Sequence, residues 1–406
     1  MQEGVLPMKS NIILIVMDSM RLDEFKKLED KYGMVSSLGN PVFMDGCIAP
    51  APWTLPSHAS LFTGLYPSSH GAHETTNIKS LDIDRIKLKI PTLVSELNSM
   101  GFHTYGISAN PYVHPVYGFS EFSSFEEEPY FTDIFGSVVE VSQKLKPIIA
   151  KYRNIYGNNM LRISKSILNE EPALLLEAIA SASVHTPAAV LKKIKAKVFD
   201  GWPIEKGGSR ILGKIKNIKF EAPYFLFINL MEAHDPYTTK SGADFNWATP
   251  FLKEGPNKST ISAWKRLYTK ASFRAYKYAT QIAGTMLERY GNDQLIIFTS
   301  DHGQAFNEHG FIGHGTMLYD EIVKIPFATV SGRDLGKRGK GFCSLVNVRR
   351  FMLDYLNGGK NPLLRLYSKA VYSQSFGIPA NIRIRPEIDI DKVKKLDVKR
   401  VRRFVQ

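Results

Sequence analysis

The stretch "NIILIVMDSM" (residues 11–20) decides the fold, because a short apolar run ends abruptly at an aspartate. Seven residues are too few to cross a membrane as a helix, and the isoleucine and valine content favours a β-strand. A strand without polar alternation is typical of a parallel sheet that is buried on both faces. The run therefore predicts a central strand with Asp18 at its carboxyl end.

Further apolar runs of strand length lie at residues 224–230, 295–299 and 325–330, with 102–109 as a weaker candidate. Helical patterns separate them, at residues 91–101, 261–290 and 344–359. In the second, apolar side chains recur every three or four residues from Trp264 to Met286, and Gly291 follows. This alternation predicts an α/β fold, with a doubly wound, mostly parallel central sheet flanked by helices.

The chain has 406 residues, of which 44% are hydrophobic, which suits a single α/β catalytic domain over residues 1–406. Residues 120–215 read as helices without intervening strands and predict a mostly helical insertion or cap. Residues 385–406 predict a basic C-terminal tail. The segment "LKKIKAKVF" is basic and amphipathic, which is more typical of a solvated cap helix but leaves peripheral membrane contact open.

Lysine and arginine total 52 against 39 acidic residues, a net charge of +13 that suits an anionic substrate. No basic repeat or zinc-finger spacing accompanies this charge, so nucleic acid is not expected as a partner. No apolar run predicts stable membrane insertion, and no feature indicates an oligomeric state. Cys47 and Cys343 lie far apart in the sequence, which argues against a disulfide framework and predicts a reducing, cytoplasmic location.

Acidic and histidine residues follow three of the predicted strands, namely Asp18, His234, Asp235, Asp301, His302 and His314. In open α/β sheets ligands bind outside the carboxyl ends of the strands, so we expect these side chains to converge. Carboxylates with imidazoles favour a divalent cation such as Mn, Zn, Mg or Ca. Purely structural interpretations of these residues stay open, because Asp18 alone could cap a helix and "HDPY" could be an ordinary turn.

The stretch "APAPWTLPSHASLFTGLYPSSHGAH" (residues 49–73) sets Thr54 two residues before a proline, where a helix is expected to begin at Pro56 and Ser57. Thr54 could simply belong to that helix start. It could also be a nucleophile, because metal coordination activates a hydroxyl and a helix N-terminus favours anionic groups. His234 and His314 would then bind the oxyanion of the substrate or act as general acid.

Five segments together resemble the alkaline phosphatase superfamily, in particular its sulfatase-like branch. They are "NIILIVMDSMR", "TLPSHASLFTGLYPSSHGAH", "NLMEAHDPY", "TSDHGQAFNEHGFIGHG" with "YDEIVKIPF", and "SLVNVRRFMLDYLNG". Their order and spacing resemble this family over nearly the whole chain except the predicted insertion. The resemblance implies an alkaline phosphatase-like fold and an enzyme that hydrolyses esters with the help of a divalent metal ion.

Carried over by position, the resemblance implies one metal ion bound by Asp18, Asp301 and His302. Thr54 takes the nucleophile position and completes the metal shell. His234 and His314 are expected to contact the substrate oxyanion, Asn110 in "SANPY" to bind substrate, and His58 to take the place of the signature arginine as a catalytic residue. A second metal held by His234, Asp235 and His314 stays open as an alternative.

The departures from the sulfatase pattern favour phosphate. The cysteine or serine that sulfatases oxidise to formylglycine is replaced by Thr54, whose β-carbon carries a methyl group and cannot become an aldehyde. Ser19 stands in place of a second aspartate, and the usual lysine after "HG" is missing near Thr316. We therefore expect hydrolysis of phosphate mono- or diesters. The alternatives are a sulfuric ester hydrolase, a phosphoryl-group transferase to a glycan or lipid acceptor, and an inactive anion-binding member.

Overall fold

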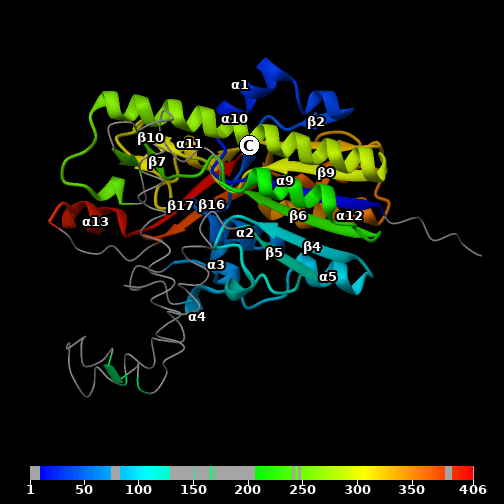
Figure 1. The fold of residues 1–406 in the computed structure, drawn as a ribbon, viewed down its shortest axis with the longest axis horizontal. Helices are drawn as coiled ribbons and strands as arrows, with labels where there is room; N and C mark the ends of the chain where they lie inside the picture. The colour runs from blue at the N-terminus through cyan, green and yellow to red at the C-terminus, as the bar shows by residue number, and fades with distance from the viewer. Residues whose placement is uncertain are drawn as a thin grey trace, which may run out of the picture.

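The computed structural model describes residues 10–74, 83–128, 206–239, 243–245, 248–379 and 386–405, with Lys151, Lys165, Ser166 and Asn169. A seven-stranded sheet of order β2-β13-β9-β1-β6-β4-β5 forms the centre of the molecule (Figure 1). Its strands are β1 (Asn11–Met17), β2 (Pro41–Phe43), β4 (His103–Ser108), β5 (Ser124–Glu127), β6 (Tyr224–Leu230), β9 (Gln294–Thr299) and β13 (Phe327–Ser331).

Strands β9, β1, β6, β4 and β5 run parallel, whereas β13 runs antiparallel to both β9 and β2. This mostly parallel sheet confirms the predicted fold class. The predicted strand over residues 325–330 is divided into β12 (Lys324–Ile325) and β13. Pro326 lies between the two and has no N–H to donate to a continuous ladder, which explains the break.

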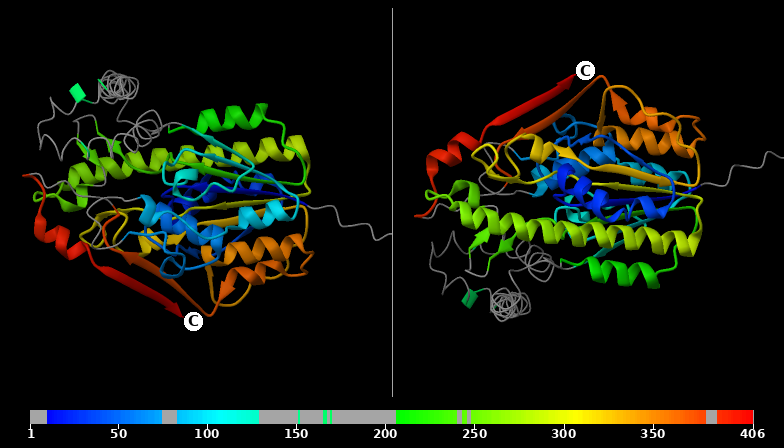
Figure 2. Two further views of the ribbon diagram at one scale, coloured as in Figure 1. Left: turned by 90° about the horizontal axis from the view of Figure 1, so that it is seen from below. Right: turned by 90° about the horizontal axis from the view of Figure 1, so that it is seen from above.

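Both faces of the sheet are buried, because β1 sends alternate side chains into two separate cores. Ile12, Leu14 and Val16 belong to one core, whereas Ile13, Ile15 and Met17 belong to the other. The first core is covered by α2 (Thr54–Thr63), α5 (Leu93–Ser99) and α12 (Val348–Leu356). The second is covered by α1 (Leu22–Tyr32), α9 (Gly208–Asn217) and α10 (Lys258–Tyr290), as the edge-on views in Figure 2 show. Two covered faces explain why β1 is uniformly apolar.

The long helix α10 follows the predicted pattern closely. The side chain of Asn257 caps its first turn by accepting a hydrogen bond from the backbone N–H of Thr260. The predicted stripe from Trp264 to Met286 is buried against the sheet, and the helix ends before Gly291. Helices α5 and α12 likewise form within the predicted residues 91–101 and 344–359.

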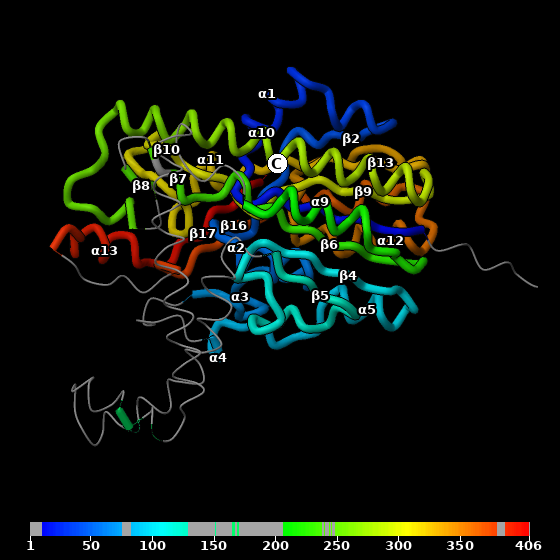
Figure 3. Tube along the Cα trace, viewed as in Figure 1, coloured from blue at the N-terminus to red at the C-terminus, as the bar shows by residue number. Residues whose placement is uncertain are grey.

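Smaller elements surround the sheet (Figure 3). A second sheet of order β12-β3-β14-β15 contains β3 (Cys47–Ile48), β14 (Phe342–Ser344) and β15 (Tyr367–Ser368). Three two-stranded ribbons pair β7 (Tyr237–Thr238) with β8 (Asp244–Phe245), β10 (Ala305–Phe306) with β11 (Ile312–Gly313), and β16 (Ala370–Phe376) with β17 (Lys399–Val405). The other helices within the described residues are α3 (Pro67–His70), α4 (Ile83–Ile86), α11 (Asp320–Val323), α13 (Ile390–Leu396), η1 (Ser36–Leu38), η2 (Pro115–Tyr117), η3 (Thr249–Phe251), η4 (Leu345–Asn347) and η5 (Pro362–Leu366).

The two ends of the predicted insertion at 120–215 belong to the core of the fold. Its start contains β5, which extends the central sheet as an edge strand, and its end contains part of α9, which packs beside α10. An edge strand can carry charges such as Glu126 and Glu127, which is why the sequence "SFEE" does not resemble a strand. The stretch between these ends lies outside the described residues apart from four isolated positions, so a helical cap there stays a prediction.

The predicted basic tail at 385–406 forms α13 and β17 over most of its length. β17 pairs with β16 from Lys399 to Val405, and Phe404 is buried. Over α13 and β17, this part of the chain is therefore folded onto the domain. Among the helices of the described ranges, none combines the length and the apolar character that a membrane span requires.

Candidate active site

Four neighbouring parallel strands end at one edge of the sheet, and a polar side chain follows each of them. Asp18 follows β1, Asp301 follows β9, Asn110 follows β4 and His234 follows β6. As the sequence predicts, these side chains meet at the carboxyl ends of the strands. The other predicted site residues, Thr54, His58, His302 and His314, lie in the same group, but the catalytic roles of all eight stay predictions.

Asp18, Asp301 and His302 form the carboxylate half of the site and are fully buried. Their candidate ligand atoms all lie within 4.8 Å of one another. His302 Nε2 is 3.7 Å from Asp18 Oδ1 and 3.5 Å from Asp301 Oδ2. Within the described chain, Asp301 Oδ2 and His302 Nε2 accept or donate no hydrogen bond. Unpaired buried polar atoms are costly, so two of them facing each other fit a divalent cation between them.

Backbone N–H groups next to Asp18 and Asp301 orient the carboxylate of Asp301. Asp301 Oδ1 accepts hydrogen bonds from the backbone N–H groups of Ser19 (3.2 Å) and His302 (2.9 Å). Ser19 adopts a φ of 61°, an unusual value for a residue other than glycine. This conformation lets its N–H reach Asp301, which leaves Oδ2 as the oxygen that faces the site.

Thr54 is the first residue of α2, so the helix begins two residues earlier than the sequence predicts. Trp53 is extended, and Pro56 is tolerated in the first turn because an N–H there needs no helical partner. Thr54 Oγ1 lies 3.5 Å from Asp18 Oδ2 and 3.2 Å from Asn110 Nδ2. Ser57 Oγ donates to the carbonyl oxygen of Asp301 at 2.7 Å and ties the helix start to the end of β9.

His58 lies one turn beyond Thr54 on α2 and is fully buried. Its Nδ1 is 3.0 Å from the carbonyl oxygen of Thr54, which can only accept, so Nδ1 carries the hydrogen. Its Nε2 then accepts from Asn229 Nδ2 at 3.3 Å. With both nitrogens engaged, the ring suits a role in holding Thr54 and Asn229 in place.

Asn229 is a site residue that the sequence analysis missed. Its Nδ2 lies 3.3 Å from Asp18 Oδ2, which also accepts from Asn110 Nδ2 at 2.6 Å. Two amides therefore bind the oxygen of Asp18 that is near Thr54. The sequence signal for Asn229 was an amide in the otherwise apolar strand "YFLFINL". A polar side chain in a buried strand needs a hydrogen-bond partner.

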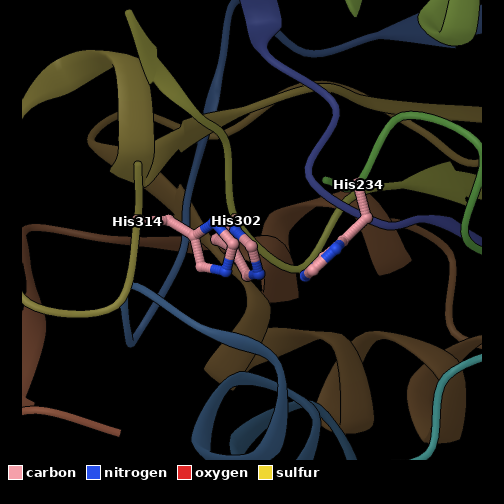
Figure 4. A group of neighbouring side chains, drawn as sticks. All are labelled: His234, His302 and His314. Carbon is pink, nitrogen blue, oxygen red and sulfur yellow. The ribbon is translucent and has the colours of Figure 1, made fainter. Parts of the chain in front are cut away.

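The imidazoles of His234 and His314 form the second half of the site, next to His302 (Figure 4). The His302 and His314 rings stack with centroids 4.4 Å apart, and His234 lies 4.9 Å from His314. His234 Nδ1 is 2.9 Å from Asp235 Oδ1, and His314 Nδ1 is 2.6 Å from Gln304 Oε1. The three imidazoles have nitrogens within 4.8 Å of one another, so a second cation would take His302 in place of the predicted Asp235.

The glycines beside His314 allow its loop to approach the start of α2. The N–H of Gly315 donates to the carbonyl oxygen of Pro52 at 2.9 Å. Gly315 has a φ of 101°, and an added Cβ would lie 2.9 Å from Pro379 Cγ. A side chain at this position would therefore clash with Pro379 and displace the loop that carries His314.

The two aspartates of the site differ in proton affinity. Burial alone would raise the pKa of Asp18, but the neighbouring imidazoles of His234, His302 and His58 together lower it. Burial and then the charge of Asp18 raise the pKa of Asp301. Two buried carboxylates thus share a region where a positive charge is favourable.

The two outer imidazoles also differ in charge. Burial opposes protonation of His234, but the charge and hydrogen bond of Asp235 raise the pKa of His234 to about 9. Burial and the neighbouring His302 hold the pKa of His314 well below its usual value. At neutral pH, His234 is therefore a cationic donor and His314 is a neutral imidazole.

Lys206 is a second residue that the sequence analysis missed. The side chain is fully buried, and its Nζ donates to the carbonyl oxygens of Glu232 (3.3 Å) and His234. Burial lowers the pKa of this lysine to about 8. It lies at the end of the predicted insertion and holds the loop that carries His234. A single lysine in "IEKGGSR" offers no sequence signal of this role.

The comparisons with known proteins agree with this fold. Residues 10–151 match the sulfatase family. An arylsulfatase of Clostridium perfringens is 21% identical over 383 residues, which cover 85% of this chain and 74% of the relative. The structure of a phosphonate monoester hydrolase of Agrobacterium radiobacter is similar over 97% of this chain and 85% of its own, with 16% identity and a TM-score of 0.55.

Two further solved structures have the same fold. A 2-O GAG sulfatase is similar over 90% of this chain and 78% of its own, with 12% identity and a TM-score of 0.53. The C-terminal periplasmic domain of EcEptC from Escherichia coli, a complex with Zn, is similar over 95% of this chain and 94% of its own, with 10% identity and a TM-score of 0.53. The chain thus has the fold of the alkaline phosphatase superfamily, and its residues 10–151 carry the sulfatase-family match that the sequence motifs predict.

Proposed function

We propose that the protein is a metal-dependent hydrolase of phosphate mono- or diesters that acts through a covalent intermediate on Thr54. The observation that carries this proposal is the Thr54 hydroxyl, 3.5 Å from Asp18 Oδ2 and next to the unpaired atoms of Asp301 and His302. A divalent cation (Mn, Zn, Ca or Mg) held by Asp18, Asp301 and His302 would lower the pKa of that hydroxyl and offset charge on the substrate.

The residues of the chain suggest how the reaction proceeds. Thr54 Oγ1 attacks phosphorus, its proton passes to water, and the bond from phosphorus to the leaving oxygen breaks. His234 is cationic at neutral pH and can donate a proton to that oxygen, so the alcohol leaves neutral. Water then attacks the phosphothreonine at phosphorus, which releases phosphate or its monoester and restores the hydroxyl.

The identity of residue 54 favours phosphate over sulfate. The methyl group on the threonine β-carbon prevents oxidation to the aldehyde that would expel a sulfuryl group. Phosphothreonine needs no such route, because water can open it at phosphorus. A sulfuric ester hydrolase is the second candidate, supported by the sulfatase-family match and the arylsulfatase relative.

Two other functions use the same residues. A transferase would differ only in the second step, where a glycan or lipid alcohol replaces water. The net charge of +13 supports an anionic substrate of either kind. An inactive anion-binding member would retain the fold without turnover.

The test is an assay of protein stripped of metal and resupplied with Mn, Zn, Mg or Ca. Nitrophenyl phosphate, bis-nitrophenyl phosphate and nitrophenyl sulfate serve as substrates. We expect metal-dependent turnover of a phosphate ester and a loss of at least ~1,000-fold in kcat for Thr54→Ala, the scale on which loss of a nucleophile acts. Thr63→Ala, at the other end of α2, is the matched control. Faster turnover of the sulfate than of both phosphates would overturn the proposal.

A further inference from the structure

Cys47 and Cys343 are the two cysteines of the chain, and the fold brings them side by side across 296 residues of sequence. Cys47 lies on β3 and Cys343 on β14, and the two are direct partners in the parallel pairing of these strands. Their Sγ atoms are 2.8 Å apart. Neighbouring strands lie about 4.8 Å apart, within the range of Cα separations that disulfides span.

The surroundings keep both thiols inside the protein. Cys47 is 0% exposed and Cys343 is 2% exposed. Tyr367 pairs with Cys343 on the far side of β14, and its hydroxyl donates to Met44 Sδ at 2.9 Å. Burial raises the pKa of the Cys47 thiol well above its usual value. The two sulfurs are therefore buried side by side, and their reaction with a molecule from solution requires local opening.

We propose that Cys47 and Cys343 form a modification site that closes into an intramolecular disulfide by exchange with a low-molecular-weight disulfide such as oxidised glutathione. One cysteine thiolate attacks a glutathione sulfur, which forms a mixed disulfide and releases one glutathione thiol. The second cysteine attacks the protein sulfur of that mixed disulfide and releases the other. The two cysteines lose two electrons, the glutathione disulfide gains them, and both protons end on the released thiols.

The position of this bond connects it to the nucleophile. β3 leads through residues 49–53 into α2, which begins at Thr54, and β14 leads into η4 and α12, which pack against α2. Ser344 Oγ already donates to the carbonyl oxygen of Ile48 at 3.1 Å, so the two strands are joined at the next position. Because the strands are already in register, the bond restrains the unfolded chain far more than the folded one.

The experiment needs no enzyme activity, so its outcome is independent of the proposed function. The full chain is incubated with oxidised glutathione at mildly alkaline pH and in mild urea, which together expose and ionise the thiols. Free thiols are then alkylated, and the protein is digested without reduction for mass spectrometry. We expect one linked peptide pair containing Cys47 and Cys343, which dithiothreitol separates, and a rise of roughly 5 °C in Tm.

Cys47→Ser and Cys343→Ala are the matched controls, because each leaves a single thiol. Neither variant is expected to form the linked pair, and glutathione should leave the Tm of each unchanged. The wild-type result does not depend on either variant folding. Two alkylated cysteines after oxidation, or glutathione attached to each without a link between them, would overturn the proposal.

Discussion

The two halves of the candidate active site differ in how their buried polar groups are paired. In the carboxylate half, Asp301 Oδ2 and His302 Nε2 face each other, and the described chain offers neither a hydrogen bond. In the imidazole half, His234 Nδ1 pairs with Asp235 and His314 Nδ1 with Gln304. The first half leaves two facing atoms for a ligand, whereas in the second half the Nδ1 atom of each outer ring already has a partner.

This difference favours separate tasks for the two halves, in line with the proposed function. An incomplete set of carboxylate and imidazole atoms suits a cation that the folded protein binds. A set whose rings are already oriented by other side chains suits contact with a substrate oxyanion, because the rings need no rearrangement on binding. Three substitutions can break or sharpen this division.

Asp301→Asn should have the largest effect, because it removes one charge from the carboxylate half without changing its shape. Loss of supporting contacts alone costs a metal site about 10–100-fold in affinity, so loss of a ligand charge should cost at least ~100-fold. In the absence of metal, the variant should be more stable than the wild type, because Asp18 no longer faces a second carboxylate. Calorimetric titration with Mn or Zn and thermal unfolding without metal measure both effects.

Asp30→Asn, on the exposed side of α1, is the control and should change neither quantity. Unchanged metal affinity in Asp301→Asn would show that the unpaired atoms of the carboxylate half do not bind a cation. Opposite signs for metal affinity and metal-free stability also exclude simple misfolding as the explanation.

Lys206→Met should have an intermediate effect confined to the imidazole half. The substitution removes the donor to the carbonyl oxygens of Glu232 and His234, so the loop that carries His234 loses a restraint. Misplacement of a reacting group by about 1 Å can cost ~100-fold in rate, so we expect kcat/KM to fall about 10–100-fold with metal affinity unchanged. Lys216→Met on the exposed face of α9 serves as the control. Equal loss of metal affinity and turnover would contradict the division.

Glu74→Gln should have the smallest effect and concerns a buried carboxylate beside the site. Glu74 accepts hydrogen bonds from Trp53 Nε1 at 2.6 Å and from the Phe376 backbone N–H at 2.7 Å. Burial raises the pKa of Glu74 to about 7. Burial would also raise the pKa of Asp18, but the imidazoles around Asp18 lower it instead.

The raised pKa of Glu74 sets the sign of its pH dependence. The folded state binds this proton more tightly than the unfolded chain, so the stabilisation is complete below the unfolded pKa of 4.5 and is lost as pH rises through about 7. A shift of this size corresponds to about 3 kcal/mol. We expect the free energy of unfolding to fall less between pH 5 and 8 in Glu74→Gln than in the wild type. Urea titrations at several pH values measure this free energy. An equal fall between pH 5 and 8 in the two proteins would contradict the prediction, and exposed Glu254→Gln is the control.

The centre of the fold was predictable from the sequence because burial on both faces leaves a continuous apolar run. Strands β1, β6 and β9 are such runs, and the polar residue after each one marks the edge where the site forms. The positions of Asp18, Asp301 and His302 follow from this rule alone. The helix α10 was equally clear, because its buried stripe has a regular period.

The peripheral strands were not predictable, because they lack continuous apolar runs. β3 and β15 are two residues long, β5 is a charged edge strand, and β17 contains four basic residues among seven, so none has the pattern of a buried strand. Asn229 and Lys206 were missed because their partners are distant in sequence. The cytoplasmic location was argued from the sequence separation of the two cysteines, which the fold places side by side, and it stays a prediction.

The most direct test of the account is the covalent state of Thr54 during turnover. Enzyme that is hydrolysing nitrophenyl phosphate is quenched in acid within one turnover, digested and analysed by mass spectrometry. The account predicts one phosphoryl group on the peptide that contains Thr54, absent from Thr54→Ala treated in the same way. An actively hydrolysing enzyme with no phosphate on Thr54, or with phosphate on another residue, would contradict it.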